Sequence, residues 1–181
     1  MSRLSTMSQA AIAALFKPDS SQTLITLLTI YDPADATGAT VLTRLADNYT
    51  QRLNDAVTDT DIIYGVRRSE SGTSRDYMFL PMQITLPSEE QNTAPRCSIV
   101  LNDVTRYVIP IIRALTAPPK VKLELVLNTS VSTTEVSFDK LYISSISYDA
   151  NQVTAELSMI DYAVEPFPAY NFTPKQFPGL F

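Results

Sequence analysis

The order of apolar and polar residues predicts a chain built mainly of β-strands. Residues 22–31 are rich in leucine and β-branched side chains, which favours a strand, and Asp32-Pro33 ends this run. Residues 62–68 and 75–79 repeat the pattern on either side of a polar segment that contains Gly72, so we expect a hairpin with a polar tip.

Five more strands are predicted further along the chain. They cover residues 82–86, 97–102, 120–128, 136–148 and 152–162. In residues 120–128 apolar side chains alternate with Lys122 and Glu124, so one face of this strand should be buried and the other exposed. The turn-forming run Asp149-Ala150-Asn151 predicts that the last two strands form a hairpin.

A short amphipathic helix is predicted over residues 5–16, and Pro18 stops it. Its apolar residues recur at helical spacing and include Leu4, Met7 and Leu15. Two arrangements stay open for this N-terminal helical arm: it packs on its own domain, or it packs on a neighbouring subunit.

A second helix is predicted inside the chain. Asp103 can cap a helix that runs to about Leu115 and has apolar residues on one side. Pro110 lies within it, so we expect a kink or a short first turn there, and Pro118-Pro119 prevents any extension.

The pattern of residues 34–61 fits two structures. A helical period connects Leu42, Leu45, Tyr49, Leu53 and Val57. Residues 41–45 fit a strand followed by a loop equally well, and periodicity alone leaves both open.

The last sixteen residues combine prolines with aromatic side chains. This segment, residues 166–181, holds four prolines and five aromatic residues, and Lys175 is its only charged residue. Proline favours an extended path, and large apolar side chains favour burial against a surface. We therefore expect an extended docking tail that packs on its own domain or on a neighbour. Its expected contact residues are Phe167, Tyr170, Phe172, Phe177, Pro178, Leu180 and Phe181.

These elements predict a mainly β (α+β) fold, a sandwich or barrel with one flanking internal helix. Long strands need closure or packing to protect their edges. We divide the chain into an N-terminal helical arm at residues 1–20, a β-rich domain at residues 21–165 and the docking tail at residues 166–181.

Composition excludes several classes of function. A net charge of −5 argues against a nucleic-acid clamp. The chain has no histidine, which removes the commonest general base and metal ligand. Its only cysteine, Cys97, lies in a predicted strand, and burial as a small apolar residue is its expected role. No segment reaches membrane-spanning length, and no signal peptide is expected.

Candidate chemistry is sparse. The carboxylates of Asp55, Asp59 and Asp61 lack the glycine and closing glutamate of a calcium loop, so we expect a solvated loop. Arg67 and Arg68, with Arg75 across the predicted hairpin, form a positive patch that suits a protein contact. We predict no catalytic, cofactor-binding or metal-binding residue.

The closing run Phe177-Pro178-Gly179-Leu180-Phe181, with its proline-aromatic lead-in, resembles a family of minor tail proteins of tailed bacteriophages, a domain of unknown function. The segments 77–87, 101–104, 112–115 and 123–126 fit the same resemblance, which covers the chain from about residue 61 to its end. It implies a tail-tube-like domain at the tail tip or baseplate, assembled as a ring around a channel.

The leading hypothesis is a structural virion protein that joins the tail tube or distal tail ring to the central hub or fibres. Its expected partners are these tail proteins and further copies of itself, and DNA should pass without specific binding because the chain is acidic. The protein would be made and assembled in the bacterial cytoplasm. A receptor- or carbohydrate-binding module is the alternative, and a wall-degrading hydrolase is a third hypothesis that the absence of histidine disfavours.

Overall fold

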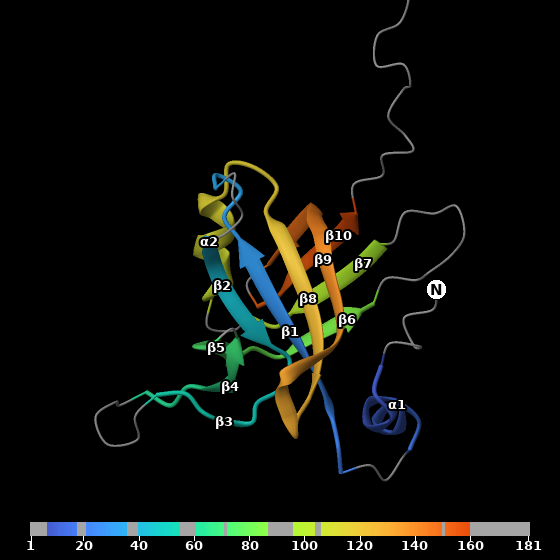
Figure 1. The fold of residues 1–181 in the computed structure, drawn as a ribbon. Coiled ribbons are helices and arrows are strands. Elements are labelled where there is room, and N and C mark those ends of the chain that lie inside the picture. Colours follow the sequence, from blue (N-terminus) through green and yellow to red (C-terminus); the bar gives the residue numbers. More distant parts are fainter. Residues whose placement is uncertain are drawn as a thin grey trace, which may run out of the picture.

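The computed structural model describes residues 7–17, 21–35, 40–54, 61–70, 72–86, 96–103, 106–149 and 151–159. Its strands form one ten-stranded sheet in the order β3-β4-β5-β2-β1-β8-β9-β10-β7-β6 (Figure 1). The strands are β1 (Leu24–Tyr31), β2 (Val41–Ala46), β3 (Gln51–Arg52), β4 (Tyr64–Glu70), β5 (Thr73–Phe79), β6 (Met82–Thr85), β7 (Arg96–Leu101), β8 (Lys120–Leu127), β9 (Ser130–Tyr148) and β10 (Val153–Met159). The helices are α1 (Gln9–Phe16) and α2 (Val108–Ala114).

Strand β1 lies near the centre of the sheet and is buried on both faces. It pairs antiparallel with β2 on one side and with β8 on the other. Successive side chains of a strand point to opposite faces. In β1, Ile25 and Leu27 belong to one hydrophobic cluster, whereas Leu28 and Ile30 belong to another. The nearly unbroken apolar run of β1 therefore reflects burial of both faces.

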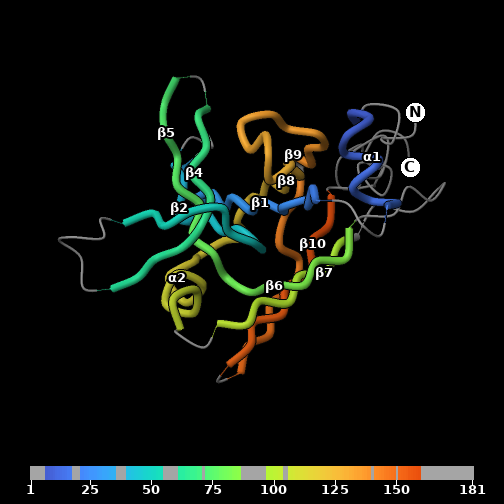
Figure 2. Tube along the Cα trace, turned by 90° about the horizontal axis from the view of Figure 1, so that it is seen from below, coloured from blue at the N-terminus to red at the C-terminus, as the bar shows by residue number. Residues whose placement is uncertain are grey.

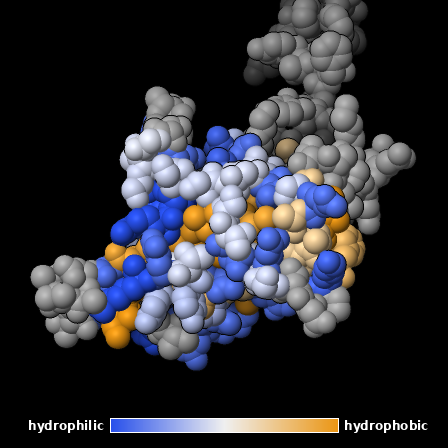
Figure 3. Space-filling model, turned by 60° about the horizontal axis from the view of Figure 1, so that its bottom comes forward, coloured by the Kyte–Doolittle hydropathy of each residue, from blue (hydrophilic) through white to orange (hydrophobic). Residues whose placement is uncertain are grey.

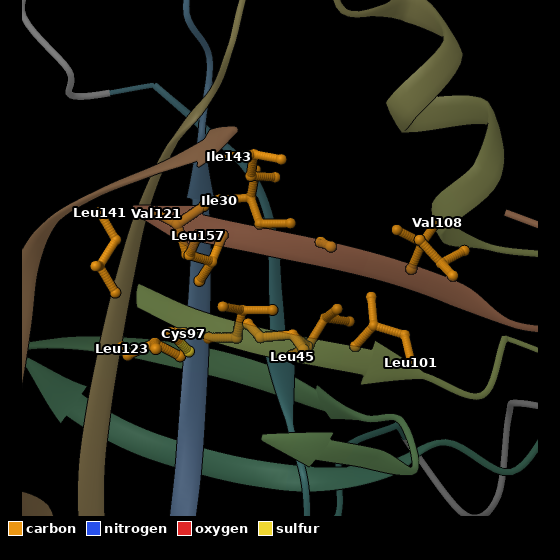
Figure 4. Close-up of a cluster of buried hydrophobic side chains, with 14 of the residues drawn as sticks. Ile30, Leu45, Cys97, Leu101, Val108, Val121, Leu123, Leu141, Ile143 and Leu157 are labelled. Carbon is orange, nitrogen blue, oxygen red and sulfur yellow. The ribbon is translucent and has the colours of Figure 1, made fainter. Parts of the chain in front are cut away.

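The larger cluster is the main core and joins two parts of the sheet. It collects buried side chains from β1, β2 and β8, from β7, β9 and β10, and from α2 (Figure 4). Figure 1 shows β7 and β10 running obliquely across the direction of β1 and β8. Since both parts bury side chains in one core, the sheet bends over onto itself.

Strand β9 carries this bend. Its first part pairs with β8, and its last part, from Leu141 to Tyr148, pairs with β10. Register shifts interrupt both ladders, and such bulges bend a strand and increase its twist. One strand of 19 residues therefore links the two parts of the sheet.

The hairpin of β4 and β5 covers the opposite face of β1. Val66 and Tyr77 from this hairpin are buried in the second cluster with Ile25 and Leu27. At Gly65 a Cβ would lie 2.0 Å from the carbonyl oxygen of Tyr77, so only glycine allows the two strands to approach this closely. Figure 2 shows the outer end of the hairpin projecting from the body of the molecule.

Helix α2 begins at Val108, later than the sequence predicts. Asp103 accepts hydrogen bonds from the backbone N–H groups of Tyr107 (2.8 Å) and Val108 (2.7 Å), so it caps the helix from a preceding loop. Pro110 explains the shift. Its missing N–H falls in the first turn, where backbone donors have no partner within the helix. In a helix that began at Asp103, the same residue would break an internal hydrogen bond.

Several sequence predictions are confirmed. The fold is mainly β, with an internal and an N-terminal helix. The strand at residues 22–31, the hairpin around Gly72 and the hairpin that closes the β-rich region are all present. Asp149 stabilises the last turn by accepting hydrogen bonds from the backbone of Asn151 and Gln152.

Other predictions require correction. Of the two structures left open for residues 34–61, the strand is correct over residues 41–46, where β2 pairs with β1, and the helix is wrong there and at residues 51–52, which are also a strand. Glu124 is buried and not exposed, because β8 is covered on both faces. In the described part of the chain, the outer strands β3 and β6 do not pair with each other, so the sheet is open and not a closed barrel. The docking tail lies outside the described residues.

Candidate protein interface

The first candidate contact surface is an aromatic patch, which we define as Tyr49, Ile62, Ile63 and Tyr64. All four side chains are exposed, and Ile62 is exposed to 63%. The rings of Tyr49 and Tyr64 lie 5.1 Å apart, and Tyr49 also contacts the ring of Phe79 at 5.3 Å. Ile62 and Ile63 directly precede Tyr64 in the chain, so exposed apolar groups gather here, and such a gathering has the character of an interaction site.

Local hydrogen bonds fix the backbone beneath this patch. The N–H of Ile63 donates to Asn54 Oδ1 at 3.1 Å, and its carbonyl accepts from Leu53 N at 2.8 Å. Asn54 in turn accepts from Arg52 Nε at 2.9 Å and donates to the carbonyl of Asp61. The apolar side chains therefore stand on a hydrogen-bonded frame between β3 and β4.

The second candidate surface is the α1 patch, formed by Leu15 and Phe16. Leu15 is exposed to 50% and Phe16 to 71%. The start of α1 is fixed to its own domain, because Ser8 donates to the carboxylate of Glu135 from its backbone N–H (2.8 Å) and from its hydroxyl (2.9 Å). Ala11, a residue of the helix itself, is fully buried.

Thus α1 packs on its own domain at one end and exposes apolar side chains at the other. Met7 packs against the main core, whereas Leu15 is left at the surface. Leu4 lies outside the described residues, as do the predicted tail contacts Phe167, Tyr170, Phe172, Phe177, Pro178, Leu180 and Phe181.

The two patches lie on opposite sides of the molecule. Figure 2 places β3 and the adjoining end of β4 at one side and α1 at the other, with the central strands between them. Figure 3 shows apolar surface at both ends of one face. Two different patches on opposite sides suit a contact in which one copy binds the next head to tail.

The predicted positive patch requires correction. Arg67 forms an ion pair with Asp76 at 2.7 Å, and this hydrogen-bonded guanidinium lowers the pKa of the Asp76 carboxyl. Arg75 lies 3.1 Å from the carboxylate of Glu70. Acidic neighbours therefore neutralise the charge that the sequence alone attributes to the hairpin.

Arg68 lies inside the protein. Its Nη1 lies 3.2 Å from Glu124, and its Nη2 donates to Thr134 Oγ1 at 2.7 Å. The side chains of Arg68 and Glu124 are only 6% and 3% exposed, so this arginine ties the hairpin to β8 and β9 and does not contribute to a surface patch. No local pattern in the sequence predicts the buried pair, since its partners are far apart along the chain.

The aromatic patch was not predicted from the sequence either. The only local signal is the apolar run Ile62-Ile63-Tyr64, which equally fits the start of a buried strand. In the fold this run lies at the edge of the sheet, where the two-residue strand β3 pairs with the start of β4 and is the outermost strand.

Two further features bear on chemistry. Burial raises the pKa of the Cys97 thiol to about 11, so this side chain is held as an unreactive thiol. Within the described ranges no three His, Cys, Asp or Glu side chains are grouped to hold a metal ion. In the same residues the two helices are too short to span a bilayer.

A family assignment comes from comparison with known proteins. No curated protein matches the chain significantly. One family model does match, over residues 14–172, and this range includes all ten strands of the sheet and the residues of both patches. The chain belongs to the family described as "Domain of unknown function (DUF1833)".

Proposed function

We propose that this protein is a structural virion component of a bacteriophage tail tip or baseplate. It would form a ring around the DNA channel and join the tail tube or distal tail ring to the central hub or fibres. The family is phage-associated, and a mainly β chain with a flanking helix is compatible with the tail-tube-like fold that the sequence resemblance implies.

The observation that carries this proposal is the pair of apolar patches on opposite sides of the molecule. A two-fold dimer uses one self-complementary patch, whereas a ring uses two different patches that meet between successive copies. In the proposed ring, the aromatic patch of one copy packs against the α1 patch of the next. Phe16 and Ile62, the most exposed side chain of each patch, would be at the centre of this contact.

The charge of the chain fits a channel through which DNA passes. Proteins that hold nucleic acid place lysine and arginine against its phosphates. This chain has a net charge of −5, and the arginines of the β4–β5 hairpin are paired with carboxylates. We therefore propose that DNA moves past the ring without specific binding.

Cysteine cross-linking in assembled particles tests the proposed ring. Phage carrying Phe16→Cys together with Ile62→Cys would be treated with a short bis-maleimide, and the products separated under denaturing conditions. Head-to-tail contacts predict a ladder of oligomers that ends at the ring size. The native Cys97 is buried and has a raised thiol pKa, so it should not contribute.

The single variants are the matched controls. Phe16→Cys alone and Ile62→Cys alone should give no ladder, since each contact between copies would then contain only one of the two cysteines that the cross-link needs. Dimers from a single variant would instead indicate a two-fold interface. Particles that lack the chain, or a double variant that gives no cross-link, would contradict the proposal.

A further inference from the structure

A polar cleft lies between the hairpin of β4 and β5 and the face formed by β1, β2 and β8. Its volume is about 270 Å³, and it lies on the same face of the sheet as the second hydrophobic cluster. Strands β2 and β5 open this space because they pair over only two positions, Leu45 with Met78 and Ala46 with Phe79. Beyond these pairs the two strands diverge, and the cleft lies between them.

Most of the charges in the cleft wall are paired. Glu124 is held by the buried guanidinium of Arg68 and by Lys122 Nζ, each at 3.2 Å. Glu70 lies 3.1 Å from Arg75. Arg44 also lines the cleft and is half-buried, but among the described residues it has no carboxylate partner. The cleft wall therefore has one positive charge that no carboxylate balances.

Other groups in the wall can donate hydrogen bonds. Burial of Lys122 lowers its pKa, but the carboxylates of Glu124 and Asp139 outweigh this effect and raise it overall, so the ammonium stays charged. Burial also raises the pKa of Tyr31, which keeps its phenol protonated and able to donate. Arg75 Nε is buried and has no well-aligned acceptor, despite its short distance to Glu70.

We propose that this cleft binds a carboxylate group and that Arg44 is the residue that recognises it. A guanidinium presents two parallel N–H donors that match the two oxygens of a carboxylate. A cation would be repelled by Arg44. A carboxylate with one negative charge matches the single positive charge that the ion pairs in the wall leave unbalanced, whereas a phosphate with up to two negative charges exceeds it. The inference rests on the cleft and stands apart from the proposed ring.

The carboxylate could belong to a small free acid or to an acidic side chain of another protein, and titration of the full-length chain separates the two. Sodium acetate and the capped amino acid acetyl-Glu-amide, each with one carboxylate, would be added separately, at constant ionic strength, and followed by two-dimensional NMR. We expect saturable shifts at backbone amides of β1, β2 and β5 around the cleft. Tighter binding of acetate assigns the site to a small acid, and tighter binding of acetyl-Glu-amide assigns it to a protein partner.

The variant Arg44→Gln should weaken binding of the better probe by about tenfold or more, because it removes the charge-assisted hydrogen bonds. Arg44→Lys keeps the charge but loses the two parallel N–H donors of the guanidinium. Its affinity for the probe should lie between those of Arg44→Gln and the native protein. Arg113→Gln on the exposed side of α2 is the matched control and should leave binding unchanged. Three results would each overturn the proposal. They are equal binding by the native protein and Arg44→Gln, shifts that map away from the cleft, and no saturation with either probe in the native protein.

Discussion

At the scale of single residues, burial distinguishes two neighbouring ion pairs of the β4–β5 hairpin. Arg67 and Asp76 lie 2.7 Å apart but are 44% and 45% exposed, so water and salt screen their attraction. Arg68 and Glu124 lie 3.2 Å apart but are almost fully buried. Removing one partner of a buried pair leaves an uncompensated charge, and this loss exceeds any effect of the shorter, exposed pair.

Arg68→Ala should therefore lower the free energy of unfolding by about 3 kcal/mol, the lower end of the range for breaking a buried pair, because Glu124 loses its buried guanidinium partner but keeps Lys122. Arg67→Ala, one residue away, should change it little. Urea denaturation of the two variants measures the difference. Equal effects of the two substitutions would show that Arg68 is not held in the interior.

Cys97 provides a second test at this scale. Its thiol is buried and has a pKa raised to about 11, so little thiolate forms at pH 8 in the folded protein. We expect Ellman's reagent to react with the folded protein far more slowly than with the protein in denaturant, where the thiol has its ordinary pKa. Rapid reaction of the folded protein at pH 8 would contradict the buried position in β7.

At the scale of elements, helix α2 depends on an aspartate outside it. Asp103 is fully buried and accepts two backbone hydrogen bonds at the start of the helix. A carboxylate near these N–H groups also interacts favourably with the helix dipole. Asp103 therefore holds in place the helix whose residues Val108 and Ile109 enter the main core.

Asp103→Ala should lower the free energy of unfolding by roughly 2 kcal/mol, since it leaves buried donors without an acceptor. Asp149→Ala is a suitable control, because Asp149 also accepts two backbone hydrogen bonds but lies in an exposed turn, where water can replace it. Thermal unfolding of both variants should show the larger loss for Asp103→Ala. A larger loss for Asp149→Ala would mean that the α2 cap contributes little.

The elements also show how far the sequence predicts this fold. Residues 22–31 and the hairpin around Gly72 are predictable because strand-forming runs and turn residues are local signals. The strand of residues 41–46 is ambiguous from sequence because its pairing with β1 decides its structure. Burial of Glu124 and exposure of Ile62 depend on which strands cover them, and that information lies in distant parts of the chain.

The docking role of the proline-aromatic tail can be tested by deletion. Its composition favours docking against a protein surface. Deletion of residues 177–181 should leave the β-rich domain folded, with an unchanged circular-dichroism spectrum, but should block tail assembly. Normal yields of infectious particles from this deletion would contradict the docking role.

At the scale of the whole molecule, the open sheet and the position of its surface patches support the proposed ring. The exposed aromatic patch lies beside the edge strand β3, and the α1 patch lies on the other side of the molecule (Figure 2). Each patch exposes apolar area that a neighbouring copy could bury. Burial would stabilise the contact by about 25 cal/mol for each Å² of apolar surface removed from water.

Cryo-electron microscopy of intact particles would show whether successive copies of this chain form the proposed ring at the phage tail tip. In such a ring we expect density for this chain around the channel at the end of the tube, with Ile62 and Tyr64 of each copy buried against Phe16 of the next. Absence of the chain from the particle, or its presence only on a peripheral fibre, would rule out the ring.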